Sequence, residues 1–310
     1  MSPRPYGGRF RSRRSCGSRG GSEAMEVTEL EGLTISWDAR PLAPDSVYGE
    51  DYMRIYRNVA GLLKIVQKAF DEPKGDLAIG FSGGKDSFTC ALALEPFLRE
   101  WDVNPKLVTV DVRVRGVEVW RPYRKELDRM AKALGYEFEL VRAEEDVAEP
   151  SEELNKPPCK ICSAIRRRIL AERHDVVVYG HTAEDAIETL LMSVNRRRDA
   201  GTFPPADLLE EDDALLLRPL YVVSELRTAR VYHEVTSRLG LPKVEPECPY
   251  AKRYRNSDSP RRTASELVER LREIARVRDE LAVENLARGL ARMALADVLC
   301  GRGRLEMPSS

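Results

Sequence analysis

A six-residue segment of this chain carries the groups that a phosphate-binding loop needs. It consists of Ser82, Gly83, Gly84, Lys85, Asp86 and Ser87. Adjacent glycines let backbone N–H groups approach an anion closely, and a helix that begins directly after them adds partial positive charge. The serine hydroxyls can donate hydrogen bonds, and Lys85 supplies a cation. The segment predicts a phosphate or pyrophosphate site; the alternative is an ordinary Gly-Gly turn before a helix.

This segment is not a Walker A loop. That pattern requires glycine where Ile79 stands, and serine or threonine after the lysine, where Asp86 stands. A nucleotide bound here would therefore be held by a different kind of loop.

Three cysteines form the second chemically suggestive group. Cys159 and Cys162 make a CxxC pair, and Cys248 follows far along the chain. A CxxC pair alone is ambiguous between a redox pair, half of a zinc site and iron–sulfur ligation. No second CxxC is present, and the three histidines lack the spacing of a zinc-binding pair. Three thiolates on a four-iron cluster would leave one iron open for a substrate ligand. The alternative is two surface thiols and an unrelated third.

A third group follows the apolar run Val176–Tyr179. It contains Gly180, His181 and, at the start of a predicted helix, Thr182 and Asp185. Asp185 could bind Mg²⁺ or orient a nucleotide, because carboxylates and phosphates share such ions. Alternatively, Glu184 and Asp185 only complement the helix dipole. Thr182 is the expected N-cap.

Alternating apolar segments predict the elements that position these groups. Strands are expected at 77–81, 106–112, 136–141, 175–179 and 215–220, and helices at 51–71, 86–99, 120–134, 160–173, 184–195, 224–239 and 262–299. Pro96 is expected to kink or shorten its helix, and the acidic segment 142–157 is expected to be a mobile loop. This alternation predicts an α/β fold with a doubly wound parallel sheet. Ligands bind such sheets beyond the carboxyl ends of the strands, where the glycine loop, Asp111 and Gly180-His181 would meet in one crevice.

Composition limits the class of protein. The 310 residues are 42% hydrophobic, which suffices for one large domain with an extension. The first 25 residues hold six arginines against one glutamate, so they form either a nucleic-acid contact or a solvated disordered tail. No signal-peptide core or run of about 18 apolar residues is present. We therefore expect a cytoplasmic protein without membrane contact.

Taken in order, the motifs resemble one family. They are SGGKDS at 82–87, PPCKIC at 157–162, GHTAEDAIET at 180–189, RPLYVVSE at 218–225 and EPECPYA at 245–251. This set resembles the PP-loop ATP pyrophosphatases that 2-thiolate tRNA, which have the adenine nucleotide alpha hydrolase-like fold. The EPECPYA segment looks most like the branch that acts on uridine 54. Composition, helical spacing and this resemblance together predict four segments: a disordered tail (1–25), a lead-in with a helix (26–75), the PP-loop ATPase domain (76–250) and a helical extension (251–310).

The resemblance also implies a mechanism. ATP would adenylate the pyrimidine O2, with the 82–87 loop, Asp111, Gly180 and His181 binding the nucleotide with Mg²⁺. Cys159, Cys162 and Cys248 match the family's [4Fe–4S] ligands. Lys85, Asp185 and Arg166 match catalytic positions, although Arg166 stands where the uridine-54 branch usually has lysine. The implied partners are tRNA and a ubiquitin-like sulfur carrier or another sulfide donor, and a homodimer is left open.

The chain also departs from that branch, which carries zinc-binding cysteine pairs at both ends. Here only Cys16 and Cys300 stand in those regions, so the zinc ribbons are expected to be absent. Because the ribbons help to hold tRNA, two alternatives stay open. One is another PP-loop adenylating ligase, such as a lysidine synthetase or an amidotransferase-type synthetase. The other is a non-catalytic RNA-binding paralogue.

Overall fold

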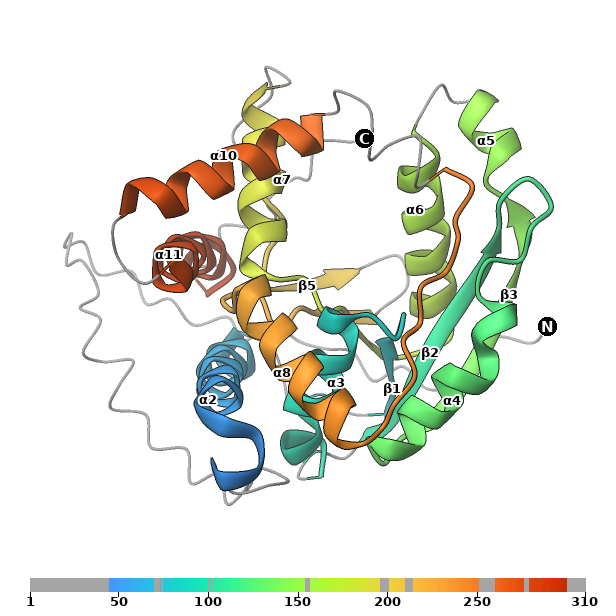
Figure 1. The fold of residues 1–310 in the computed structure, drawn as a ribbon. Helices are drawn as coiled ribbons and strands as arrows, with labels where there is room; N and C mark the ends of the chain where they lie inside the picture. Colours follow the sequence, from blue (N-terminus) through green and yellow to red (C-terminus); the bar gives the residue numbers. More distant parts are fainter. Residues whose placement is uncertain are drawn as a thin grey trace.

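A six-stranded sheet forms the centre of the molecule in the computed structural model (Figure 1). The described residues are 45–69, 73, 75–99, 101, 103–153, 157–195, 201–209, 214–250, 260–275 and 279–299. The strands are β1 (Gly75–Gly80), β2 (Val103–Arg113), β3 (Glu137–Asp146), β4 (Val176–Val178), β5 (Ala206–Leu209) and β6 (Ala214–Leu217). Their order is β3-β2-β1-β4-β6-β5, and every pair is parallel except β5 with β6. The predicted doubly wound α/β fold is confirmed, with an unpredicted antiparallel strand, β5, at one edge.

The central strands are apolar because helices cover both of their faces. All residues of β4 and β6 are buried, and so are Leu77, Ala78 and Ile79 of β1. Continuous apolar runs of this kind are typical of parallel strands with two covered faces. In Figure 1, helix α6 (Pro158–Ala171) lies on one side of β2 and helix α4 (Arg124–Ala133) on the other.

The remaining helices include the predicted ones in order, with a short helix added in the predicted loop and the predicted stretch 262–299 divided into two helices. They are α2 (Asp45–Ala69), α3 (Lys85–Leu98), the 3-10 helix η1 (Arg121–Tyr123), α5 (Ala148–Glu153), α7 (Ala183–Asn195), α8 (Glu225–Arg238), α10 (Pro260–Ala275) and α11 (Asp279–Leu299). None of the described helices combines the length and apolar character needed to cross a bilayer. The predicted basic tail, Cys16 and Cys300 lie outside the described residues.

The loop prediction for 142–157 was wrong in its described part. Strand β3 continues to Asp146, and α5 follows it. The Asp146 carboxylate accepts hydrogen bonds from the backbone N–H groups of Arg115, Gly116 and Ala148, so an acidic side chain orders this segment. The expected shortening at Pro96 was also wrong, because Pro96 lies in the last turn of α3 and the helix continues to Leu98.

Buried ion pairs join the last two helices to the rest of the molecule. Helix α10 packs on α7, and α11 packs on α7 and α2. Arg272 of α10 pairs with the buried Glu184 of α7. Arg227 of α8 pairs with Glu284 of α11 at 2.9 Å and also with Asp51 of α2. Three helices that are distant in sequence therefore meet at one buried guanidinium.

Candidate active site

The site lies where the sheet changes direction. The chain runs outward from β1 to β2 and β3, then returns to β4 on the other side of β1. The carboxyl ends of β1 and β4 are therefore neighbours, which is the usual position of a ligand crevice. Gly180 follows β4 and touches the start of α3, where a Cβ atom would lie 2.8 Å from the Asp86 carbonyl oxygen. Only glycine allows this close approach.

The loop after β1 is fixed by its own side chains. The Ser82 N–H donates to Ser87 Oγ at 3.1 Å, and the Gly84 N–H donates to Ser82 Oγ at 3.3 Å. Gly83 has a φ of 67°, and a Cβ there would lie 2.8 Å from Leu127 Cδ2. The two glycines and two serines thus form a compact turn at the amino end of α3, where an anion is favoured.

Lys85 and Asp86 belong to a polar cluster that includes two residues the sequence reasoning missed. Lys85 Nζ lies 2.7 Å from Asp86 Oδ2 and 3.1 Å from Glu225 Oε2, and Thr228 Oγ1 donates to Asp86 Oδ1 at 2.6 Å. Burial alone would lower the pKa of Lys85, but the two carboxylates raise it. Lys85 is therefore a stable cation beside the loop. Glu225 ends the RPLYVVSE motif, which was the available signal for it.

The residues after β4 form the second wall of the crevice. Asp185 Oδ2 accepts from the Thr182 N–H at 3.0 Å, and Asp185 Oδ1 accepts from Arg261 at 2.9 Å. The Thr182 contact is one half of a capping box, directly before α7. Asp185 therefore already binds both its own helix start and the C-terminal helix α10.

Burial shifts the pKa values of two neighbouring groups. It lowers the pKa of His181 to about 4, with the Arg218 charge acting in the same direction, so the imidazole is neutral at pH 7. His181 packs between the rings of Tyr179 and Phe203, with centroids 5.6 and 5.0 Å away. Burial raises the pKa of Glu184 to about 7 although Arg272 opposes the shift.

Asp111 positions a loop. Its buried carboxylate accepts hydrogen bonds from the backbone N–H groups of Val119, Trp120 and Arg121 at 3.0, 3.1 and 2.8 Å. These contacts fix Trp120 near the end of β2. A direct role of Asp111 in nucleotide binding stays a prediction.

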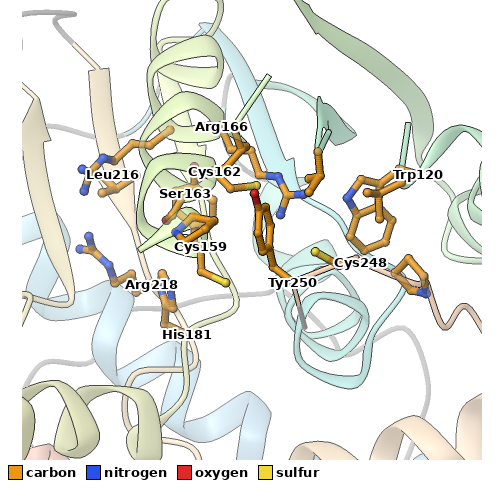
Figure 2. A pocket seen from close by; sticks show the side chains of 17 residues that line it. Trp120, Cys159, Cys162, Ser163, Arg166, His181, Leu216, Arg218, Cys248 and Tyr250 are labelled. Carbon is orange, nitrogen blue, oxygen red and sulfur yellow. The ribbon is translucent and has the colours of Figure 1, made fainter. Parts of the chain in front are cut away.

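The three cysteines line one cavity of about 370 Å³ (Figure 2). Cys159 and Cys162 lie in the first turn of α6, and Cys248 comes from the segment after α8. In the view of Figure 2, the Tyr250 ring stands between the α6 thiols and Cys248. Tyr250 is held by Arg115, whose Nε lies 3.2 Å from the phenol oxygen and whose guanidinium carbon lies 5.2 Å from the ring centroid.

The three cysteines are of the ligand type that iron–sulfur clusters use. Among the described residues, no three His, Cys, Asp or Glu side chains converge closely enough to hold one metal ion. A cluster is larger, and its usual ligands are cysteine thiolates spread around it. Burial raises the pKa of Cys159 and Cys162, whereas the Arg166 charge opposes this rise. Arg166 therefore favours the thiolate forms that such ligation requires.

A second cavity of about 230 Å³ adjoins the phosphate loop. It is lined by Ser82, Asp86, Ser87 and Gly180, among others. Four residues line both cavities: Trp120, Arg166, Tyr179 and His181. The structure thus brings the predicted phosphate loop, His181, Arg166 and the three cysteines to one double cavity. The sequence reasoning did not identify Trp120 as part of it.

Comparisons with known proteins identify the family and several relatives. The family model of the PP-loop domain matches residues 56–235. A protein of Methanocaldococcus jannaschii named a probable sulfurtransferase is 25% identical over 236 residues, which cover 65% of this chain and 69% of that protein. A tRNA-cytidine(32) 2-sulfurtransferase of Francisella philomiragia is 30% identical over 160 residues, or 49% of this chain. The match spans only 61% of that relative's length.

The solved structures include a similar fold. The U34-tRNA thiolase NcsA from Methanococcus maripaludis, solved with its [4Fe–4S] cluster, superposes with a TM-score of 0.55. The match is 20% identical in sequence and covers 78% of this chain and 79% of the other. At this identity, the similarity supports the fold.

Proposed function

Because this chain belongs to the PP-loop domain family, we propose that it is an ATP-dependent enzyme that replaces the 2-oxygen of a tRNA pyrimidine with sulfur. One observation carries the proposal: the phosphate-loop cavity and the three-cysteine cavity share a wall. An enzyme that activates an oxygen with ATP and then replaces it with sulfur needs these two sites next to each other.

The first half of the reaction belongs to the phosphate-loop cavity. The pyrimidine O2 attacks the α-phosphorus of ATP, pyrophosphate leaves, and AMP stays bonded to the former O2. Backbone N–H groups of the 82–87 loop and the Lys85 cation stabilise the charge on the leaving pyrophosphate. We assign Mg²⁺ to the Asp185 carboxylate, where it would displace the Arg261 guanidinium from Oδ1, and nucleotide contacts to Gly180 and His181. Adenylation turns a poor leaving oxygen into a good one.

The second half belongs to the cysteine cavity. Cys159, Cys162 and Cys248 would hold a [4Fe–4S] cluster, which supplies an open iron position for sulfide. Sulfur then bonds to C2, and AMP leaves with the former O2. Arg166 lies in the shared wall and supplies positive charge toward the leaving phosphate. The sulfur source would be a ubiquitin-like carrier protein or another sulfide donor.

The base we propose is uridine 54, because the segment around Cys248 resembles that branch. Cytidine 32 is the second candidate, because the Francisella relatives are named for that base. A lysidine-type ligase would have no use for three cysteines beside the phosphate loop. A non-catalytic RNA-binding protein would have no need for the Lys85 cluster.

The test is a reconstituted reaction. Protein purified without oxygen is incubated with ATP, Mg²⁺, sulfide and tRNA that lacks thiolated bases, and the nucleosides are analysed by mass spectrometry. We expect 2-thiouridine to appear only with ATP, at position 54 when the tRNA is mapped. Product at cytidine 32 would change the assigned base. Absence of any thiolated nucleoside, with iron present and ATP bound, would overturn the proposal.

A further inference from the structure

Trp120 stands at the boundary between the two cavities and has no assigned role. It is 8% exposed, and its side chain lines both cavities. Its indole N–H has no hydrogen-bond partner among the described residues. The Arg166 guanidinium carbon lies 5.6 Å from the centroid of its ring. A large flat side chain with an unused donor therefore faces the place where both half-reactions would meet.

The backbone of Trp120 is held rigidly. Asp111 accepts hydrogen bonds from three consecutive N–H groups around it, and the Asp111 carboxylate is buried. Hydrogen bonds from N–H groups to a buried carboxylate are among the strong ones. Arg166, in contrast, is a long side chain on the second half of α6. The backbone that carries the indole is thus fixed, and the guanidinium that packs against the ring sits at the end of a side chain with several rotatable bonds.

Other polar atoms of the shared wall also lack partners. Among the described residues, Tyr179 Oη, His181 Nδ1 and Arg166 Nε are buried without a hydrogen bond. Buried polar groups are normally satisfied, so a cluster of unpartnered ones indicates a bound molecule with its own donors and acceptors. The adjoining cavity of about 370 Å³ falls within the usual range for small-ligand sites.

From these observations we infer that Trp120 is the stacking platform for the target pyrimidine of tRNA, with Arg166 moving off the indole to admit the base. This inference rests on the proposed function and names the substrate contact of that site. Enzymes that modify a base take it out of its stack, and aromatic side chains or arginine planes hold the extruded base. A base on Trp120 would have one edge toward the phosphate loop and the other toward the cysteines.

The experiment uses the fluorescence of Trp120. The chain has three tryptophans, so the double variant Trp37→Phe and Trp101→Phe leaves Trp120 as the single indole. Two pairs of ligated tRNAs are titrated into it without ATP. One pair has uridine or an abasic site at 54, and the other has cytidine or an abasic site at 32. We expect one of the intact tRNAs to quench the Trp120 fluorescence. The abasic tRNA of the same pair should not quench it.

Affinity measurements give an independent result. Stacking on an aromatic side chain contributes about 1–3 kcal/mol per base, so Trp120→Ala should weaken binding of the intact tRNA about 5- to 150-fold. It should leave the abasic tRNA unaffected, and Trp120→Phe should keep most of the affinity. The matched control is Trp101→Phe, a buried tryptophan outside both cavities, which should not change the difference between intact and abasic tRNA.

Thiolation is measured on the same samples, so that the two proposals fail separately. Base-dependent quenching without any thiolated product supports the stacking platform and rejects the proposed function. Thiolation with equal quenching by intact and abasic tRNA overturns the platform and keeps the function. Quenching by AMP but by neither tRNA would place adenine on Trp120, which also overturns it.

Discussion

The phosphate loop is held mainly by hydrogen bonds between residues within five positions of one another, whereas the cysteine cavity joins segments far apart in the chain. Ser82, Gly84 and Ser87 bond among themselves at the start of α3. The cysteines come from α6 and from the segment after α8, which is anchored at two points: the Tyr123 hydroxyl donates to the Glu245 carbonyl oxygen, and Arg115 holds Tyr250.

The two sites should therefore respond differently to substitutions. A change in the phosphate loop should act on the chemistry without loosening the fold, because the turn is built from its own residues. The cysteine cavity should respond to changes at the residues that anchor the segment carrying Cys248. The predictions below test this contrast.

The largest effect is expected at Lys85. In Lys85→Ala, ATP-dependent pyrophosphate release should fall by a factor of about 10²–10³, because a donor to developing charge is lost. Thermal unfolding should change little, since Lys85 contacts only side chains at the rim. The control is Lys132→Ala, an exposed lysine on α4. Unchanged pyrophosphate release would remove this loop as the ATP site.

Substitution of the three cavity cysteines should stop sulfur transfer without stopping adenylation. Cys159→Ala, Cys162→Ala and Cys248→Ala should each lose thiolation, together with the iron of the proposed cluster, which we expect to be about four irons per wild-type chain. Pyrophosphate release should remain, because the phosphate loop is built independently. Iron analysis and nucleoside mass spectrometry measure the two properties. Cys90→Ala is the control, as that thiol lies in the core; a Cys248→Ala protein with full iron would exclude Cys248 from the site.

His181, in the wall that the two cavities share, should make the stability of the fold depend on pH. Its pKa is lowered to about 4, below the ordinary 6.5, so between these values the unfolded chain binds a proton that the folded chain does not. Stability from this group is therefore present above pH 6.5 and is lost as pH falls toward 4. Relative to His181→Gln, the wild type should lose about 3 kcal/mol over this window.

Chemical denaturation at several pH values measures that difference. The exposed His233→Gln variant should follow the wild-type curve. Parallel curves for the wild type and His181→Gln would mean that His181 is not held neutral by its surroundings.

Gly180, beside the phosphate loop, has a matched control in Gly289 of α11. Gly180→Ala should destabilise the fold by about 1–3 kcal/mol and weaken ATP binding, because its Cβ would press on the backbone of Asp86 and Ser87. Gly289→Ala lies in α11, and beyond the helix's own backbone no atom of the described residues lies within 4 Å of the added Cβ, so this variant should stabilise by about 0.5–1 kcal/mol. Calorimetry and nucleotide titration test both; equal shifts for the two variants would contradict the close approach.

The smallest effect is expected at Tyr250, which anchors the segment that carries Cys248. Tyr250→Phe removes the hydrogen bond with Arg115 but keeps the ring, which should cost about 0.5–1.5 kcal/mol of stability. It should also raise the rate at which Cys248 reacts with a thiol reagent, while pyrophosphate release stays constant. Tyr123→Phe tests the second anchor of the same segment. Unchanged Cys248 reactivity in both variants would show that the cavity does not depend on these anchors.

The same contrast explains what the sequence could predict. The phosphate loop and the parallel strands depend on local residue types and apolar runs, so they could be predicted without knowing the partners. Trp120 could not, because its place in the wall depends on Asp111 and on α6. The short strand β5 needs β6 beside it, and the ordered start of the predicted loop at 142–157 needs the turn at Arg115, which has a φ of 52°.

Thr228 and Arg261 also contact predicted site residues only through tertiary packing. Thr228 reaches Asp86 from α8, and Arg261 reaches Asp185 from α10. A helix pattern predicts that such helices exist, but it does not specify which residue of another helix they will touch.

The ion pairs of the last two helices decide how far the chain can be shortened. A protein cut after residue 250 would keep every residue that lines the two cavities. It would also leave Glu184 without Arg272, and Arg227 without Glu284. Arg227 would keep Asp51 as a partner, whereas the Glu184 carboxylate would lose its guanidinium; removing one partner of a buried ion pair typically costs about 3–5 kcal/mol. The smallest part of the chain that folds on its own should therefore include α10 and α11. Affinity tags or fusion partners should be attached after α11.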